Sequence, residues 1–295
     1  MASELVRELV DAGIHFGHRV SRWNPKMAPY IFGKRNLIHV IDIRETVKGL
    51  IRAKKFLARV VAENGDVLFV GTKRQARHAV EEYARQAKMP YVTERWLGGT
   101  LTNFETIRLR LARLEELERE ETDGTLQQYS KKRIARDNRE RRKIARNLDG
   151  VRTMSRLPKA LVIIDVHREH IAVREARKLK IPTVCLIDTD SDPDFADIPI
   201  PGNDDSMRSI EVLMKHMVAA VEMGRRGRVA EPEDAGGTTA AARQRPRRPV
   251  TASADAEAGD DMAMAAPDSP EVAGPQDGIG QAPAAPGQVV SERSS

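Results

Sequence analysis

Short apolar runs alternate along this chain with amphipathic helical segments, and that alternation constrains the fold more than any other feature. The runs are rich in β-branched residues and apolar on both faces, which is typical of buried parallel strands. We expect strands at 37–41, 66–70, 90–93, 160–165 and 183–188, and helices at about 44–63, 72–88, 168–180 and 206–224. This order predicts an α/β fold, with a doubly wound parallel sheet of the Rossmann or flavodoxin type.

One long insertion interrupts the alternation. Between about 103 and 147 there is no strand pattern, only helix-forming and charged residues. A turn at 122–125 divides this segment, and a second helix is expected near 128–148. The insertion therefore predicts an antiparallel helical hairpin whose two helices pack along an apolar seam. The apolar residues of the first helix recur in steps of three and four at Phe104, Ile107, Leu111, Leu114 and Leu117.

These patterns predict three parts. The α/β domain is discontinuous and comprises 1–102 and 149–228, with the helical hairpin inserted at 103–148. Residues 229–295 contain no aromatic side chain and are rich in Ala, Pro and acidic residues. A segment of that composition cannot bury enough apolar surface to offset its loss of conformational entropy. We therefore expect 229–295 to be a disordered tail.

Charge is distributed unevenly between body and tail. The whole chain has 49 Lys and Arg residues against 43 Asp and Glu residues, a net charge of +6. Residues 229–295 hold 5 basic and 11 acidic residues, so the net charge is −6 there and +12 over 1–228. A strongly basic body favours nucleic acid or another anionic surface as the partner. The single cysteine excludes a disulfide framework, and no apolar segment approaches a membrane span of about 20 residues. We expect a cytoplasmic protein with no membrane partner.

The segment 131–146 is the most basic in the chain, with nine Lys and Arg residues against two acidic ones. A charged helix is often only a solvated face, but nine cations on one short helix repel unless an anion screens them. We therefore interpret it as a phosphate-contacting surface. The candidate residues are Lys131, Lys132, Arg133, Arg141 and Arg142.

Two strand-to-helix turns offer further contacts. The turn at 71–74 places backbone amides at a helix N-terminus, where an anion can bind, although an ordinary solvated turn explains it equally well. It fits neither nucleotide-binding glycine motif. Arg95 and Trp96 precede two glycines, and such side chains can stack on bases, although a buried Trp96 is the alternative. Thr102 and Asn103 follow as helix caps.

An acidic loop at 188–194 follows a strand, at the edge where doubly wound domains bind ligands. It lacks the Gly and Glu of a calcium-binding EF-hand loop. One interpretation is a magnesium-dependent phosphate-handling site completed by Asp204 or Asp205, and His15 and His18 could make it a mixed zinc site. A turn whose Asp side chains cap backbone amides is the simpler alternative.

Six motifs in sequence order then identify a family. They read AGIHFGH at 12–18, WNPKM at 23–27, FVGTKR at 69–74, RWLGG at 95–99 with LTN at 101–103, DTDSDP at 188–193 and IPGNDD at 200–205. Together they resemble the bacterial-type uS2 family of small-subunit ribosomal proteins, over about 2–224. The resemblance implies a doubly wound domain with a coiled-coil hairpin and no catalysis. It also implies binding to 16S rRNA, contact with neighbouring small-subunit proteins, and support for the mRNA-binding protein bS1. No homo-oligomer and no required cofactor are expected.

The resemblance also implies functional roles for individual residues. The RNA-binding or docking candidates in matching motifs are Trp23, Lys26, Lys73, Arg74, Arg95, Trp96, Thr102 and Asn103. Arg22 joins them on charge alone. A divalent ion, zinc or magnesium, near the bS1 contact is implied for His18, Asp188, Asp204 and Asp205. The very basic second hairpin helix and the long tail depart from the family pattern.

Two other function classes compete with a structural ribosomal role. The first is a magnesium-dependent enzyme on the doubly wound fold, using the acidic loop that begins at Asp188 and, for phosphate, the turn at 71–73. The second is a free RNA-binding adaptor that never joins the ribosome. Charge alone excludes neither, so the family motifs decide the prediction.

Overall fold

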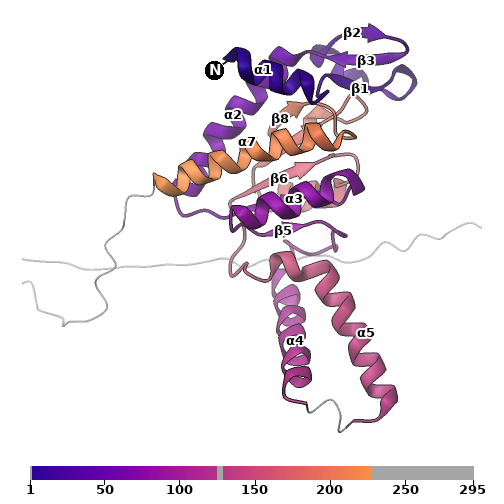
Figure 1. Cartoon of the computed structure of the whole chain (residues 1–295), viewed down its shortest axis with the longest axis vertical. Coiled ribbons are helices and arrows are strands. Elements are labelled where there is room, and N and C mark those ends of the chain that lie inside the picture. Colours follow the sequence, from indigo (N-terminus) through magenta and orange to yellow (C-terminus); the bar gives the residue numbers. More distant parts are fainter. Residues whose placement is uncertain (1, 125–128, 228–295) are drawn as a thin grey trace, which may run out of the picture. The chain divides into compact units, whose positions relative to one another are not determined.

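The computed structural model describes residues 2–124 and 129–227 (Figure 1). The helices are α1 (Ala2–Asp11), α2 (Ile43–Ala62), α3 (Arg74–Gln86), α4 (Phe104–Thr122), α5 (Lys131–Leu148), α6 (His170–Lys178) and α7 (Met207–Arg226). The strands are β1 (Phe16–Arg19), β2 (Ile31–Arg35), β3 (Ile38–Ile41), β4 (Val67–Val70), β5 (Tyr91–Val92), β6 (Ala160–Ile164), β7 (Thr183–Ile187) and β8 (Ile198–Pro201). Among these described residues, no helix is long and apolar enough to cross a membrane.

Five strands form a parallel sheet in the order β5-β4-β6-β7-β8. Numbered along the chain, this is the order 2-1-3-4-5 of flavodoxin-like doubly wound domains. β4, β6 and β7 are buried along their whole length, because helices cover both faces of the sheet. The predicted strands at 66–70, 90–93, 160–165 and 183–188 are confirmed as β4 to β7.

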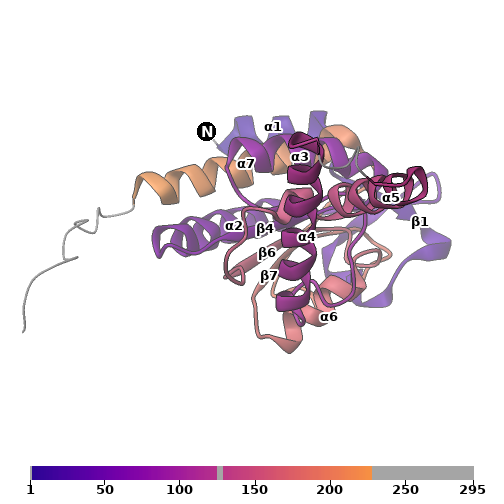
Figure 2. The same cartoon turned by 90° about the horizontal axis from the view of Figure 1, so that it is seen from below.

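Alternate side chains of each central strand enter two different cores. Phe69 and Leu186 pack against α2, α3 and α7, whereas Leu68 and Ile163 pack on the other face against α6 and the roots of α4 and α5. Figure 2 shows β4, β6 and β7 between α7 and α3 on one side and α6 on the other. Because successive side chains of a strand point to opposite faces, each central strand contributes to the apolar cores on both sides of the sheet.

The predicted strand at 37–41 belongs to a different sheet. β3 forms an antiparallel sheet with β1 and β2, two strands that were not among those expected from the sequence. The fifth parallel strand is instead β8, which the sequence pattern did not indicate. Pro199 and Pro201 lie in β8, and they are tolerated because β8 is the last strand in the sheet order, where one side needs no donors.

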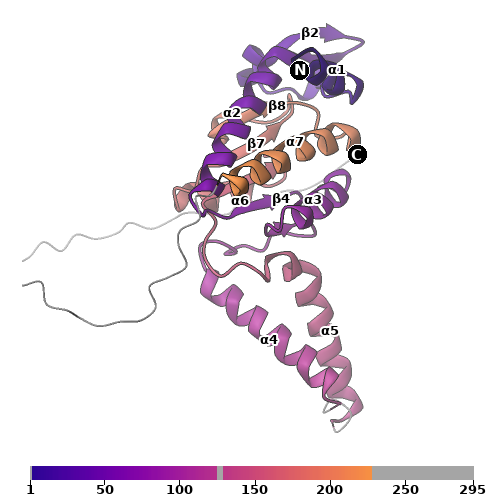
Figure 3. The same cartoon turned by 60° about the vertical axis from the view of Figure 1, so that its left-hand side comes forward.

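The inserted segment forms two helices that lie side by side and extend away from the sheet (Figure 3). Their apolar stripes are buried between them, with Leu114 fully buried and Ile144 at 9 % exposure. Glu94, just after β5, forms ion pairs with Arg77 of α3 and Arg146 of α5. This contact fastens α5 to the sheet. The coiled-coil interpretation and the domain boundaries stay predictions, and the predicted tail lies outside the described residues.

Candidate functional site

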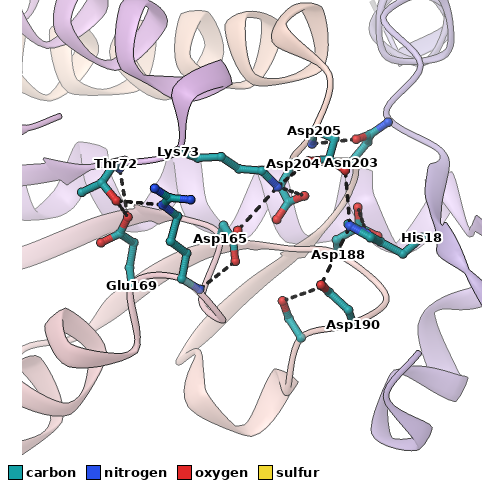
Figure 4. A network of polar contacts seen from close by, with 12 residues as sticks. His18, Thr72, Lys73, Asp165, Glu169, Asp188, Asp190, Asn203, Asp204 and Asp205 are labelled. Atoms are coloured by element: carbon teal, nitrogen blue, oxygen red, sulfur yellow. Dashed lines mark hydrogen bonds and ion pairs between the residues drawn. The ribbon is translucent and has the colours of Figure 1, made fainter. Parts of the chain in front are cut away.

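The carboxyl ends of β4, β6, β7 and β8 meet at one edge of the parallel sheet, and polar side chains gather there (Figure 4). Lys73 follows β4, Asp165 follows β6, Asp188 follows β7 and Asp204 follows β8. A doubly wound domain binds its ligands at this edge, where the strand order reverses. The reversal lies between β4 and β6. Lys73 and Asp165 therefore flank the position where such a domain holds a ligand.

The sequence indicated an anion site at the backbone amides of the turn at 71–74. In the structure, Glu169 from the turn after β6 accepts a hydrogen bond from one of these amides. Its Oε1 accepts hydrogen bonds from the Thr72 amide at 2.9 Å and from the Thr72 hydroxyl. Arg168 Nε donates to the same hydroxyl at 3.1 Å. Burial raises the pKa of Glu169, whose residue exposure is 2 %. An external phosphate would have to displace this side chain from the helix N-terminus.

Lys73 is surrounded by acidic side chains. Its ammonium lies 2.8 Å from Asp204, 2.6 Å from Asp205 and 3.5 Å from Asp165. Burial alone lowers the pKa of Lys73, but these three carboxylates outweigh it and the net shift is upward. The predicted RNA-binding Lys73 is therefore a charged internal ion-pair partner.

His18 reaches the same network from β1. Its Nδ1 lies 3.0 Å from Asp188 and its Nε2 lies 3.3 Å from Asp205. The hydrogen bond with Asp188 raises the pKa of His18 to about 9. Gly17 makes this approach possible, because a Cβ there would lie 2.6 Å from the side chain of Thr189. β1 therefore carries His18 to the acidic edge, beside Asp188 and Asp205.

Three of these groups have the geometry of a metal site. Ligand atoms of His18, Asp188 and Asp204 all lie within 4.8 Å of one another. One imidazole nitrogen and two carboxylates suit zinc, with a fourth position left for water. Burial beside Asp165 and Asp188 raises the pKa of Asp204 to about 8, although Lys73 acts in the opposite direction. A divalent cation fits this donor set and would compete with Lys73. Asp205, 52 % exposed in its side chain, lies at the rim.

Trp96 lies in the protein core, and Glu175 of α6 holds it there. The Trp96 indole N–H donates to Glu175 Oε1 at 3.1 Å, and Trp96 is 6 % exposed. The amides of Gly99, Leu101 and Thr102 donate to the same carboxylate at 2.8, 3.0 and 3.1 Å. Burial raises the pKa of Glu175, but these hydrogen bonds outweigh it and the net shift is downward. Glu175 therefore orders the turn that leads into α4.

Neither Glu169 nor Glu175 was among the predicted site residues. Both are acidic residues in or beside a helix that reads as an ordinary amphipathic segment. The available signal was the turn each one contacts, since 71–74 and 95–103 both present amides without local acceptors. A helix N-terminus and a glycine-rich turn both need an acceptor from elsewhere in the chain.

The remaining RNA-binding candidates differ in how exposed their side chains are and in whether other residues of the protein already contact them. Trp23 is 36 % exposed and lies against His39, with ring centroids 5.1 Å apart. Asn103 is exposed and accepts from the Thr106 hydroxyl at 2.8 Å. The exposed candidates with no acidic partner in the described part of the chain are Arg22, Arg74, Arg95, Lys131, Lys132 and Arg142.

Three other cationic candidates are held in ion pairs on the protein itself. Lys26 contacts Asp192 at 2.8 Å and Asp194 at 2.6 Å. On α5, the buried carboxylate of Asp137 pairs with Arg133 at 3.4 Å. Arg141 is 2.6 Å from Glu121 of α4. These last two pairs join or neutralise the hairpin helices, so their cations are less available to an RNA phosphate.

Comparisons with known proteins agree with this geometry. A family model described as ribosomal protein S2 matches residues 9–224. A protein of Rhodopirellula baltica, named small ribosomal subunit protein uS2, is 60 % identical over 225 residues, covering 76 % of this chain and 86 % of the relative. Proteins with the same name from Sorangium cellulosum and Salinispora tropica are 49 % and 48 % identical over 243 and 241 residues. Those matches cover 82 % and 79 % of this chain, and 87 % and 82 % of the relatives.

Proposed function

This chain belongs to the ribosomal protein S2 family, and on that premise we propose that it binds 16S rRNA through cations of α5 and supports the docking of bS1. Family membership establishes the broader role: the protein is a structural component of the small ribosomal subunit and not an enzyme. It works in the cytoplasm as part of the ribosome. The surfaces that make its contacts are those whose charges and apolar side chains are free of partners on the protein itself.

The observation that carries the rRNA proposal is a set of cations on α5 without acidic partners. Lys131, Lys132 and Arg142 are exposed, and no carboxylate of the described residues lies within ion-pair distance of them. Unscreened cations on one helix repel, and an RNA phosphate that binds them releases condensed counterions. These three side chains are therefore the strongest rRNA contacts that the hairpin offers.

The experiment measures affinity for small-subunit rRNA as a function of salt. Changing Lys131, Lys132 and Arg142 to Gln should weaken binding and flatten the slope of log affinity against log salt, by about 0.7–0.9 for each phosphate that is no longer bound. The parent and the variant chain are compared by filter binding to rRNA over a range of potassium concentrations.

A matched control removes the same charge elsewhere. Arg52, Lys55 and Arg59 are exposed cations on α2, and changing them to Gln lowers the net charge equally. If both variants flatten the slope to the same extent, general attraction by net charge explains the binding and the α5 contact is refuted.

The enzyme interpretation receives no support. Glu169 already accepts the hydrogen bond of the Thr72 amide in the turn at 71–74, and the Lys73 ammonium is held by acidic side chains of the protein itself. The family is one of structural proteins.

The bS1 proposal is supported by an exposed apolar surface on the small antiparallel sheet. Phe32 of β2 is 79 % exposed and Phe16 of β1 is 49 % exposed. A cavity of about 750 Å³ beside Phe32 is lined by Val6 of α1 and Val47 of α2. Large exposed apolar patches on soluble proteins mark protein interaction sites. We therefore propose that bS1 docks here.

Substitution of Phe32 by Ser tests this surface. We expect bS1 affinity to fall by about tenfold or more, because central aromatic side chains contribute most of the binding energy at protein interfaces. The control is Leu109→Ser on α4, which removes a side chain that is 71 % exposed and far along the chain from the sheet. Equal bS1 retention by both variants on purified subunits would place the docking surface elsewhere.

We also propose that His18, Asp188 and Asp204 hold a divalent cation, with zinc preferred over magnesium because one donor is an imidazole. The ion would neutralise the acidic edge. Zinc should raise the unfolding temperature of the full chain, and a chelator should reverse the rise. Asp204→Asn should abolish this response, whereas Asp66→Asn, at a surface carboxylate paired with Arg156, should preserve it. Absence of zinc binding at micromolar concentration would refute the site.

A further inference from the structure

A groove beside α6 is divided by one aromatic side chain. Its first hollow, of about 340 Å³, is lined by His170, Arg174 and Phe195. A second hollow of about 280 Å³ lies towards the end of α6 and is lined by Arg177, Lys180 and again Phe195. Phe195 therefore separates two neighbouring hollows, each near the lower limit of about 300 Å³ for small-ligand pockets.

The α6 side of this groove is positively charged. His170, Arg174 and Arg177 follow steps of four and three residues, so they share one face of the helix, and all three are exposed. None of them has an acidic ion-pair partner among the described residues, and Arg177 donates only to the backbone carbonyl of Asp194. Arg174 and Arg177 are cations without acidic partners and attract an anionic ligand, and the His170 imidazole offers an N–H donor beside them.

The acidic residues across the groove do not balance these cations. Asp192 is paired with Lys26 at 2.8 Å. Asp197 accepts the amide of Thr183 at 2.8 Å and its hydroxyl at 3.0 Å. The third acidic residue that lines the groove is Asp190, whose carboxylate lies 3.9 Å from His18 Nε2 and accepts the Ser191 hydroxyl at 3.2 Å. All three carboxylates thus have partners on their own side of the groove.

Phe195 presents a flat surface between the hollows. Its side chain is 39 % exposed, and the Arg177 guanidinium lies 5.1 Å from the ring centroid. Val173 of α6 lines both hollows beside the ring. Unpaired bases stack on exposed aromatic rings and guanidinium groups of this kind, largely without regard to base identity.

We propose that the groove beside α6 binds a short single-stranded segment of RNA, with one base in each hollow stacked against Phe195 and the phosphates along His170, Arg174 and Arg177. The inference rests on the proposed RNA-binding function and adds an RNA contact on a different element from α5. An acidic peptide would pair with the cations, but its acidic side chains have no flat ring to stack on Phe195 between the two hollows.

The test uses the full chain with Lys131, Lys132 and Arg142 changed to Gln, so that the α5 cations do not contribute. Binding of fluorescently labelled hexaadenylate is measured by anisotropy, in parallel with a blunt twelve-base-pair RNA duplex. We expect the single strand to bind more tightly, since only unpaired bases can enter the hollows.

Two substitutions separate stacking from charge. Phe195→Leu should weaken hexaadenylate binding by about tenfold without changing its salt dependence. Arg174→Gln should flatten the slope of log affinity against log salt by about 0.7. The controls are Met207→Leu and Arg208→Gln, an exposed large apolar residue and an exposed arginine outside the groove, and neither should change binding. Unchanged unfolding temperatures confirm that the variants are folded.

Three results would overturn the inference. The first is equal affinity of hexaadenylate for the parent and the Phe195→Leu protein. The second is competition by adenosine monophosphate at the same concentration as by hexaadenylate, which would indicate a single-nucleotide site. The third is displacement of hexaadenylate by polyglutamate, together with equal polyglutamate affinity for the parent and the Phe195→Leu protein. That result would indicate a site for acidic peptides.

Association with the small subunit is measured separately by sedimentation. A Phe195→Leu protein that still sediments with subunits but no longer binds hexaadenylate supports the inference. If the parent chain binds no single strand yet sediments with subunits, the inference fails and the proposed function stands. Failure to sediment at all refutes the proposed function instead. Photocrosslinking in assembled subunits, with and without added mRNA, then shows whether ribosomal or messenger RNA supplies the strand.

Discussion

The turn between β2 and β3 holds both Asn36 and Leu37 at positive φ, 50° and 62°. Asn tolerates this left-handed conformation, but a branched aliphatic residue clashes with its own backbone there, at a cost of roughly 1–2 kcal/mol. Leu37 is also 80 % exposed, so burial does not offset the cost. Strain retained at an exposed apolar side chain agrees with a docking role for this sheet.

We therefore expect Leu37→Gly to stabilise the protein by about 0.5–1 kcal/mol, because glycine adopts this conformation freely. Chemical denaturation monitored by circular dichroism measures the change. Leu37→Ala is the control: it removes the exposed side chain but keeps the Cβ, so the free energy of unfolding should stay within error. A gain in Leu37→Ala equal to that of Leu37→Gly would assign the cost to apolar exposure rather than to strain.

Glu169 makes stability depend on pH. Burial raises its pKa above the ordinary value of 4.5, helped by the charge of Asp165 and opposed by Arg168. The folded state therefore holds the proton at pH values where the unfolded state has released it, so this contribution is complete below pH 4.5 and is lost as pH rises through the folded pKa. We expect Glu169→Gln, which still accepts from Thr72, to remove that part of the decline.

The measurement is the free energy of unfolding between pH 4.5 and 7.5 for both proteins. One titrating proton changes it by at most about 1.4 kcal/mol per pH unit, which sets the largest difference in slope. Parallel curves for the two proteins would show that Glu169 is ionised in the folded state as readily as in the unfolded one.

At the scale of residues, the sequence predicted which side chains lie at the acidic edge better than it predicted which side chains they and their neighbours contact. The edge that brings Asp188 and Asp204 together follows from strand order, because parallel strands end together, whereas His18 reaches this edge from β1 of the other sheet. Trp96 was given two interpretations, and the core contact with Glu175 supports the buried one. Glu175 itself was missed because it lies 79 positions away, and a periodic pattern cannot show a long-range hydrogen bond.

At the scale of elements, α2 and α7 approach each other closely at Gly224. A Cβ at Gly224 would lie 2.4 Å from the Ala58 carbonyl oxygen, a backbone atom that cannot turn aside. The two helices would have to separate locally. Gly224→Ala gains up to about 1 kcal/mol in helix propensity, but overpacking costs about 1–3 kcal/mol.

We expect Gly224→Ala to lower stability by about 1–2 kcal/mol on balance, measured by urea denaturation. Gly227→Ala is the matched control, because a Cβ there meets only ordinary contacts at 3.5 Å. The control should be neutral or slightly stabilising. Equal effects of the two substitutions would show that helix fraying, rather than the α2–α7 contact, determines the outcome.

The long elements were predictable because their apolar patterns repeat over several turns. α2, α3, α4 and α7 and the strands β4, β6 and β7 all follow such patterns. β8 was missed because prolines normally exclude a strand, and only its place in the sheet order explains them. β1 and β2 were missed because short exposed strands with Gly17 and Gly33 have little apolar pattern, and their pairing with β3 depends on contacts across the chain.

For the whole molecule, the decisive quantity is how much of the positive charge RNA can reach. Residues 1–228 have a net charge of +12, and residues 229–295 subtract 6 from it. The cations of the folded part fall into two groups, those that neutralise the protein's own carboxylates, such as Lys73 and Arg133, and those that have no partner among the described residues, such as Lys131 and Arg174. Only the second group is available to phosphates, so net charge overstates the RNA-binding surface.

The acidic tail should therefore act on affinity through the long-range field. We expect deletion of 229–295 to increase affinity for non-specific RNA at low salt, with the difference vanishing above about 0.3 M salt as screening shortens the Debye length below about 6 Å. Binding to a random RNA by filter retention at several salt concentrations measures this. A full-length control in which six of the 11 acidic tail residues are changed to Asn or Gln leaves the tail with 5 basic and 5 acidic residues, so it should match the deletion. If the neutralised tail still lowers affinity as the native tail does, excluded volume rather than charge explains its effect.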